Sequence, residues 1–272
     1  MIHNLKSNVG KNVMSNIFRY LPYEARFATT STGSVTVDMK GISGRKLVIE
    51  PGDGSSLERI TYLGTGTNVP WTHDYSGTAG SKTVTFRGVE NITSIDTKNN
   101  NTLAIDIDQF LGFRNCDVIN TGYATLTGNA ANFNIANFPA LTVLICRYCS
   151  MSFIPADLQT LVNLTVLYVY NNNGTGDLGG FATLSNLDYF RVNDNAFTYL
   201  QTTSWPAYNG VSIQLQSTLS TAAEVDRLLI DFNDSGLVNN TINLAGTNPA
   251  RTSASDAAVA ALVLAGNVLT LN

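Results

Sequence analysis

Apolar residues recur at a fixed interval in the middle of the chain. Between residues 138 and 197 they fall at offsets 0, 3 and 5 from three starts that lie 23 residues apart, at Leu141, Leu164 and Leu187. A further apolar residue precedes each start by three positions: Phe138, Leu161 and Leu184. Self-similarity with a period in this range predicts a solenoid, in which each repeat buries its apolar face against the next.

The three repeats resemble the leucine-rich repeat, L-x-x-L-x-L-x-x-N-x-L. Asn172 and Asn195 occupy the asparagine position of this motif, and Cys149 replaces asparagine in the first repeat. The resemblance implies a parallel sheet with one strand per repeat. Degenerate copies add starts at residues 92, 113, 210, 239 and 266, so we expect eight turns of one solenoid over residues 91–272.

Two helices are predicted in the C-terminal turns, where the interval between starts lengthens to 29 and 27 residues. The segment Thr221-Ala-Ala-Glu224 has the pattern of a capping box, and the helix that it opens is expected to end at Gly236. A second helix is expected from about Ser255 to Gly266. These helices widen the outer side of the last turns and are expected to form a C-terminal cap.

The hydrophobic period changes to two between residues 27 and 90. Apolar and polar residues alternate in four segments separated by glycine-rich turns: Ser34–Met39, Lys46–Glu50, Arg59–Leu63 and Lys82–Arg87. Such alternation is typical of antiparallel strands. We therefore predict a mostly β protein, with an N-terminal antiparallel β-sandwich followed by the solenoid.

Short motifs in the N-terminal region follow the order G-D-G, H-x-Y, G-x-x-x-V-T. They are carried by Gly52-Asp53-Gly54, by His73-Asp-Tyr75 and by the strand that begins at Gly80. This order resembles small β-sandwich modules of the polycystic-kidney-disease type, which precede leucine-rich repeats in some bacterial surface and phage proteins. The closing segments after Asn240 and Val268 also resemble repeat proteins of phage and of Bacteroidetes-like bacteria. The resemblance implies a spacer or adhesion module without catalysis.

Residues 1–26 lack a clear period and are predicted to form an N-terminal arm. Val13, Ile17, Phe18 and Leu21 fit one side of a short helix that ends before Pro22. Such an arm either docks on another molecule, as in a homo-oligomer, or folds back on its own domain. Both alternatives remain open on the sequence.

Charged residues make up only 13% of the 272 residues, about half of the usual share of roughly 25%. A surface covered mainly by asparagine, threonine, serine and glycine suits a secreted or virion protein better than a cytosolic enzyme. The net charge of −4 and the absence of a basic stripe argue against a nucleic-acid partner. No stretch approaches the roughly 20 apolar residues of a membrane span, and the first residues contain no apolar run of signal-peptide length.

The residues at offsets 2, 4 and 6 of each turn are predicted to line the exposed face of the parallel sheet. The candidate binding residues are Ile145, Arg147, Val166, Tyr168, Tyr170, Tyr189, Arg191 and Asn193. The same rule places Asn115, Asp117 and Ile119 on this face one turn earlier. Tyrosine and arginine dominate binding hot spots, which favours a recognition surface. Tyrosine also has a high strand propensity, so a purely structural explanation is the alternative.

Other groups with chemical potential have structural interpretations. Cys146 and Cys149 fall on inward positions, and the three cysteines of the chain show no disulfide framework. His73 is explained by the H-x-Y strand. Asp106-Ile-Asp108 is interpreted as one solvated face of a strand. A calcium site is the alternative for these two carboxylates, although the spacing Asp-x-Asp-x-Asp-Gly that would indicate one strongly is absent. No metal site, cofactor site or catalytic motif is predicted.

The sequence therefore favours a non-enzymatic virion surface protein, such as a phage spike, fibre or decoration protein. Its expected partners are a host-surface glycan or protein, or other virion proteins. The alternative is a bacterial cell-surface or secreted leucine-rich-repeat adhesin with an extracellular location. A glycan-acting enzyme is the third hypothesis.

Overall fold

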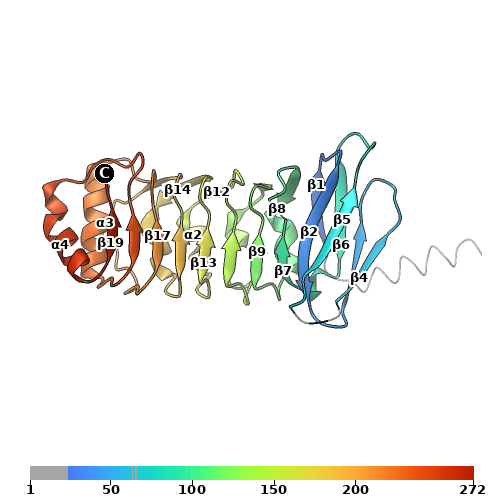
Figure 1. Ribbon diagram of the computed structural model, residues 1–272, viewed down its shortest axis with the longest axis horizontal. Helices are drawn as coiled ribbons and strands as arrows, with labels where there is room; N and C mark the ends of the chain where they lie inside the picture. Colours follow the sequence, from blue (N-terminus) through green and yellow to red (C-terminus); the bar gives the residue numbers. More distant parts are fainter. Residues whose placement is uncertain (1–23, 63, 65, 98) are drawn as a thin grey trace, which may run out of the picture.

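The computed structural model describes residues 24–272 apart from residues 63, 65 and 98. The helix predicted within residues 1–26 lies outside the described residues. The last three residues of the predicted arm, 24–26, belong to the first strand, β1 (Glu24–Thr29). The described chain forms an elongated rod whose turns follow the sequence from one end to the other (Figure 1).

A ten-stranded sheet runs along the whole rod. Its eight parallel strands are β7 (Ile92–Asp96), β9 (Val118–Asn120), β11 (Val143–Ile145), β13 (Val166–Tyr168), β15 (Tyr189–Arg191), β17 (Ser212–Gln214), β18 (Thr241–Asn243) and β19 (Val268–Thr270). Two antiparallel strands, β2 (Ser34–Gly41) and β5 (Val69–Asp74), extend the sheet beyond β7. The predicted parallel sheet with one strand per repeat is thus observed.

The strand register corrects the predicted phase of one turn. Ile119 pairs with both Ile95 and Leu144, so the second turn starts at Cys116 and not at Phe113. Ile119 is fully buried, and the outward residues of this turn are Val118 and Asn120 in place of the predicted Asn115, Asp117 and Ile119. The start of this turn was predicted three residues too early because Phe113 and Cys116 are both buried apolar residues. Together they fit the first two apolar positions of the repeat as well as Cys116 and Ile119 do.

A six-stranded sheet covers the N-terminal third of the rod. Its order is β10 (Thr125–Thr127), β8 (Leu103–Asp106), β1, β6 (Lys82–Arg87), β3 (Lys46–Glu50) and β4 (Glu58–Thr61). Strands β2, β3, β4 and β6 coincide within two residues with the four segments predicted from alternation. Strands of the region before residue 90 therefore lie in both sheets, and strands of the repeats continue each sheet: β7 pairs with β2, and β8 pairs with β1.

The two sheets share one hydrophobic core that does not stop at residue 90. Phe27 of β1 contacts Phe86 of β6, with ring centroids 5.1 Å apart, and also Phe110 of the solenoid at 5.7 Å. Trp71 of β5 meets Phe86 from the opposite sheet at 5.6 Å. The apolar side of the first repeats is therefore covered by the N-terminal strands. These strands act as the N-terminal cap of the solenoid, which would otherwise expose its apolar interior.

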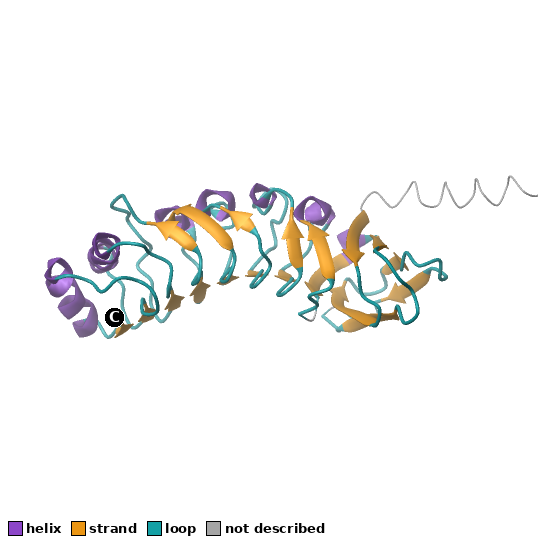
Figure 2. Ribbon diagram, turned by 90° about the horizontal axis from the view of Figure 1, so that it is seen from above, coloured by secondary structure: helices purple, strands orange, loops and turns teal. Residues whose placement is uncertain are grey.

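Helices and a third, three-stranded sheet line the side of the rod opposite the long sheet (Figure 2). The helical elements are η1 (Val89–Asn91), η2 (Ile107–Gly112), η3 (Ala130–Asn132), α2 (Pro155–Leu158), η4 (Leu178–Thr183), α3 (Ala222–Asp234), η5 (Ser253–Ser255) and α4 (Asp256–Leu264). The small sheet contains β12 (Ser152–Phe153), β14 (Asn173–Asp177) and β16 (Ala196–Thr198). The predicted capping box opens α3, since Glu224 N donates to Thr221 Oγ1 and Thr221 N donates to Glu224 Oε2.

The asparagines at offset 8 satisfy backbone groups at the corner that follows each strand. Asn172 Oδ1 accepts hydrogen bonds from the amides of Cys149 and Met151, and its Nδ2 donates to the carbonyl of Cys146 at 2.6 Å. One turn later, Asn195 Oδ1 accepts a hydrogen bond from the amide of Gly174, and its Nδ2 donates to the carbonyl of Val169. Each asparagine thus links its own turn to the preceding one, because buried backbone groups must be paired.

Candidate functional site

The exposed face of the long sheet brings the predicted binding residues together on β11, β13 and β15. Ile145, Tyr168 and Arg191 are direct neighbours in one row across the strands, and Val166 and Tyr189 are neighbours in the next row. Arg147, Tyr170 and Asn193 follow at the ends of these strands, at the same offset of successive turns. Tyr189 is exposed, and the other seven side chains are half-buried.

Ring contacts join the tyrosines of this face into one cluster. The ring of Tyr168 lies 6.3 Å from that of Tyr170 and 6.4 Å from that of Tyr189, in tilted and edge-to-face arrangements. The guanidinium of Arg191 stacks on Tyr168, 4.7 Å from the ring centroid. No hydrogen bond or ion pair with any described residue engages this guanidinium, and its Nε is buried without a partner. Only the terminal N–H groups can therefore meet a ligand.

Two further tyrosines belong to the cluster although the repeat rule did not select them. Tyr123 and Tyr148 stack with ring centroids 4.9 Å apart and an interplanar angle of 11°. Tyr148 also meets Tyr170 edge-on at 5.6 Å. We refer to Tyr123, Arg147, Tyr148, Tyr168, Tyr170, Tyr189 and Arg191 as the tyrosine face.

Arg147 links Tyr123 to Tyr170 within the tyrosine face. Its guanidinium lies 5.6 Å from the ring centroid of Tyr123 and donates hydrogen bonds to the Tyr170 hydroxyl and to Asn99 Oδ1, both at 3.3 Å. The hydrogen bond to Tyr170 raises the pKa of Arg147 further, so the side chain is cationic at any physiological pH. The cluster is therefore fixed before any ligand arrives.

The backbone of Tyr123 and Tyr148 has a left-handed conformation, with φ of 69° and 54°. Both residues lie at offset 7, where the other turns place small or polar residues with positive φ: Asn99, Asn171, Asp194, Ser217 and Gly246. A bulky side chain is disfavoured in this conformation. Such strain concentrates at functional sites. A tyrosine at offset 7, where the other turns have asparagine, aspartate, serine or glycine, is the sequence signal that could have identified these two residues.

A hollow of about 380 Å³ adjoins the tyrosine face on the side of the N-terminal strands. Ile145, the direct strand neighbour of Tyr168, lines this hollow, and the rest of the lining is mostly polar, including Lys40, Asp96 and Asn120. The exposed side of the long sheet thus passes from a polar hollow at β2 and β7 to aromatic rings on β13 and β15 and at the corners that follow β9, β11 and β13.

The cysteines are buried, as the repeat phase predicted. Cys116, Cys146 and Cys149 are inaccessible to solvent and form no disulfide. Burial raises the pKa of Cys116 and Cys149 to about 12 and that of Cys146 well above its usual value. Thiols in this state are unreactive, because the thiolate is the nucleophile and the metal ligand. The pair Cys146-x-x-Cys149 is therefore part of the packed interior.

His73 joins the two short motifs of the N-terminal region. Its Nε2 lies 2.9 Å from Asp53 Oδ2, and its Nδ1 lies 2.9 Å from Glu58 Oε1. Burial acts to lower the pKa of His73, but the hydrogen bonds to the two carboxylates outweigh it and raise the pKa. Hydrogen bonds from Ser55 and His73 hold the pKa of Asp53 well below its usual range. This cluster connects β5 to β4 and to the turn between β3 and β4, in which Asp53 lies. Such connections agree with a structural role of His73.

The interpretation of Asp106-Ile-Asp108 as one strand face is wrong. Strand β8 ends at Asp106, whose Oδ1 accepts a hydrogen bond from the amide of Asp108 and thereby caps η2. Asp108 lies within that short helix. Apolar and polar residues alternate across the boundary between β8 and η2, so the sequence pattern does not show where the strand ends and the helix begins.

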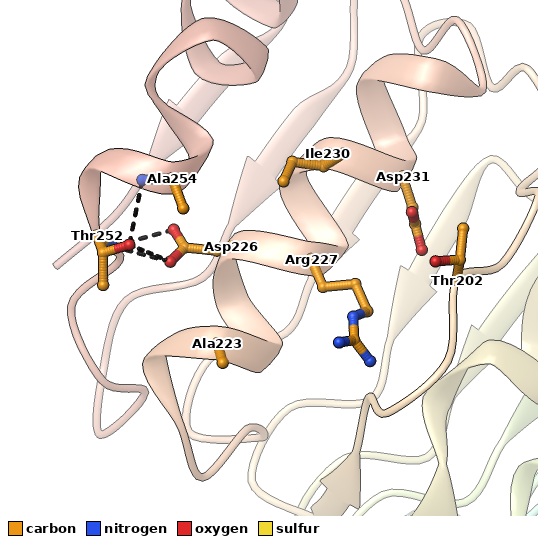
Figure 3. A pocket seen from close by; sticks show the side chains of 8 residues that line it. All are labelled: Thr202, Ala223, Asp226, Arg227, Ile230, Asp231, Thr252 and Ala254. Atoms are coloured by element: carbon orange, nitrogen blue, oxygen red, sulfur yellow. Dashed lines mark hydrogen bonds between the residues drawn. The ribbon is translucent and has the colours of Figure 1, made fainter.

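A hollow of about 470 Å³ beside α3 contains two carboxylates, and both have structural partners (Figure 3). Asp226 accepts hydrogen bonds from the amide and hydroxyl of Thr252, and Asp231 accepts from the Tyr199 hydroxyl at 2.5 Å and from the amide of Thr203. These bonds fasten the long loops around α3. Between residues 24 and 272, with the gaps noted above, no group of three or more His, Cys, Asp or Glu side chains is arranged to hold a metal ion. No described helix is long and apolar enough to cross a membrane.

Comparison with known proteins gives fold neighbours only. No family model and no curated protein match the chain. Similar solved structures include the BIR2 ectodomain from Arabidopsis thaliana, with 20% identity and a TM-score of 0.36 over 46% of this chain and 68% of that one. A leucine-rich-repeat protein of Leptospira interrogans has 16% identity and a TM-score of 0.38, covering 59% and 44% of the two chains.

A third neighbour is the leucine-rich-repeat ectodomain of the Arabidopsis receptor kinase GASSHO1/SCHENGEN3, solved in complex with CASPARIAN STRIP INTEGRITY FACTOR 2. It has 13% identity and a TM-score of 0.35, and the match covers 60% of this chain but 22% of that one. At these TM-scores the leucine-rich-repeat architecture of this chain rests on its own strand register.

Proposed function

We propose that this protein is a non-enzymatic binding protein that recognises a macromolecular ligand through the tyrosine face. The observation that carries the proposal is the connected cluster of five tyrosines and two arginines on the solvent side of the long sheet. Tyrosine and arginine supply most hot-spot energy in interfaces, and tyrosine loses little side-chain entropy on binding. A large exposed aromatic surface typically marks a contact site.

Two features of the cluster suit binding better than stability. The Arg191 guanidinium is held by a ring and has no anionic partner among the described residues, which leaves its terminal N–H groups for a carboxylate or a polar ligand group. The left-handed backbone at Tyr123 and Tyr148 costs folding energy at the very positions that complete the ring stack. The two Asp carboxylates of the hollow beside α3 are engaged in holding loops, which supports a function without catalysis.

The proposed setting is the surface of a virion, as a phage spike, fibre or decoration protein. Its partner would be a host-surface glycan or protein, or another virion protein. The low charged fraction of 13% and the resemblance of the N-terminal motifs support this setting. A bacterial cell-surface or secreted adhesin is the alternative. Mass spectrometry of purified particles separates the two, since presence in particles is expected for the first setting and absence from every particle preparation contradicts it.

The binding test compares variants of the tyrosine face with a matched surface variant. Tyr168→Ala combined with Tyr170→Ala should weaken binding to host cells or to an immobilised glycan panel by at least about 30-fold, the equivalent of a hot spot of about 2 kcal/mol. Arg191→Ala alone should reduce binding less. Leu200→Ala removes an apolar side chain that is 63% exposed and outside this face, and it should leave binding unchanged. Equal binding by the double variant and the wild type would refute the proposal.

A further inference from the structure

The polar hollow beside the tyrosine face is lined by side chains of four neighbouring strands. They include Asp38 and Lys40 of β2, Ser94 and Asp96 of β7, Asn120 of β9 and Ile145 of β11. Its volume of about 380 Å³ lies within the range of sites for small ligands, about 300–1,000 Å³. The hollow is therefore large enough to take one small polar unit of a ligand.

Several hydrogen-bonding groups of the hollow are not used by the fold. Lys40 Nζ, Ser94 Oγ and Asn120 Nδ2 form no hydrogen bond with any residue that the structure describes. Other atoms fix the side chains in place: Asn120 Oδ1 accepts from the amide of Gly122 at 3.2 Å, and Asp38 Oδ2 accepts from Asn68 Nδ2 at 2.7 Å. The hollow thus presents an ammonium, an amide and a hydroxyl next to carboxylate oxygens.

One row of outward residues leads from the hollow to the tyrosine face. Strand pairing places these residues side by side in the order Asp96, Asn120, Ile145, Tyr168, Arg191. Adjacent strands lie about 4.8 Å apart, so the distance from Asn120 to Arg191 is about 14 Å. An elongated ligand that lies across the strands can therefore contact the hollow and the rings at the same time.

The rings beside this row are accessible. Tyr123, Tyr148 and Tyr189 are 40%, 45% and 45% exposed. Tyr123 and Tyr148 follow β9 and β11, the same strands that supply Asn120 and Ile145 to the hollow. The surface thus combines a concave polar part with flat apolar rings.

We propose that the ligand of the tyrosine face is an oligosaccharide, with one sugar unit in the polar hollow and the following units on the tyrosine rings. This inference rests on the proposed function, because it names the ligand class of the same surface. Sugar hydroxyls both donate and accept hydrogen bonds, as the mixed groups of the hollow require. The apolar C–H side of a sugar ring packs on the electron-rich face of an aromatic ring.

A protein partner fits this surface less well. A dry protein interface over Lys40, Asp38 and Asp96 would remove water from charged groups, and interface cores are depleted of such residues for this reason. An extended peptide cannot add a strand here, because the strands from β2 to β15 are paired on both sides. Sugar hydroxyls, in contrast, replace the hydrogen bonds that water makes with these groups.

The experiment measures binding of the full chain to immobilised oligomers of glucose, galactose, mannose and N-acetylglucosamine. The wild type should bind at least one series, and more tightly as the oligomer lengthens. Ser94→Tyr fills the hollow with a residue that suits a strand and should weaken this binding at least about tenfold. Thr241→Tyr is the matched control, because Thr241 has the same offset in a later turn, outside both the hollow and the tyrosine face.

A second variant tests the hydrogen bonds of the hollow without blocking it. Lys40→Met keeps the apolar stem and removes the ammonium, so it should weaken oligosaccharide binding by about tenfold. Far-UV circular dichroism checks that each variant is folded. Saturation-transfer NMR adds a direct readout, since saturation of the tyrosine ring protons should reach the C–H protons of the bound sugar.

The outcomes separate this inference from the proposed function. If no oligomer binds, or if Ser94→Tyr and Lys40→Met both bind like the wild type, the inference is overturned. It is also overturned if host cells with periodate-oxidised glycans still bind the wild type and Tyr168→Ala with Tyr170→Ala abolishes that binding. The partner is then a protein, and the proposed function stands. Failure of the proposed function appears instead as unchanged binding by the double tyrosine variant.

Discussion

Replacement of Asn195 by alanine tests whether the asparagine of the repeat holds adjacent turns together. The side chain is 7% exposed and forms hydrogen bonds with its own turn and with the preceding turn. Its Oδ1 accepts a hydrogen bond from the amide of Gly174 at 2.9 Å, and its Nδ2 donates to the carbonyls of Val169 and Val192 at 3.0 and 2.8 Å. Alanine removes these bonds and supplies no substitute.

The expected loss of stability follows from the groups that remain. The Gly174 amide becomes a buried donor without a partner, which costs about 1–3 kcal/mol. The two carbonyls lose a bond worth about 0.5–1.5 kcal/mol each, partly offset where they accept other bonds. We therefore expect Asn195→Ala to lower the free energy of unfolding by about 3 kcal/mol.

Urea unfolding followed by circular dichroism measures this difference, and hydrogen exchange of the Gly174 amide reports it locally. Asn163→Ala is the matched control, because this exposed asparagine donates a single hydrogen bond, to the carbonyl of Pro139. It should lower the unfolding free energy by less than about 0.5 kcal/mol. If Asn195→Ala lost no more than the control and left the Gly174 amide protected, the reasoning about linked turns would be refuted.

Two further predictions concern titratable groups. In the folded protein at pH 8, the thiols of Cys116, Cys146 and Cys149 should not react with a thiol reagent, and all three should react in denaturant. If the folded protein were labelled as fast as an exposed thiol, this would contradict their burial. The raised pKa of His73 makes its contribution to stability complete below the unfolded value of about 6.5, and this contribution is lost as the pH rises through the folded pKa. The wild type should therefore lose thermal stability as the pH rises above about 6.5, and His73→Asn should remove this loss. An identical pH profile for the two proteins would count against the cluster with Asp53 and Glu58.

Local signals determined most of the fold. The 23-residue period predicted the stacked strands because each inward residue must meet its counterpart in the next turn. The capping box at Thr221 predicted α3 because its two hydrogen bonds need only residues three apart. The phase of the second turn was wrong, because Phe113 and Cys116 are buried by long-range packing and apolar periodicity alone cannot separate them from the strand residues.

The candidate site was predictable only where residues follow the strand period. Tyr168 and Arg191 were found because side chains alternate between the two faces of a strand. Tyr123 and Tyr148 were missed because a left-handed corner directs them onto the same face, and alternation carries no information on such a corner. The pairing of β2 with β7 was equally invisible, since no local pattern specifies which strand of one region extends the sheet of another.

The position of β1 has a mechanical consequence. This strand is where the described chain begins, and it lies between β6 and β8, antiparallel to both. A load that enters the chain at Glu24 and pulls along the strand must shear both hydrogen-bonded ladders at once, because neither can open one bond at a time. Since β8 belongs to the repeats, the tension passes directly into the solenoid. A load along this strand is therefore resisted by strands of both the N-terminal region and the repeats.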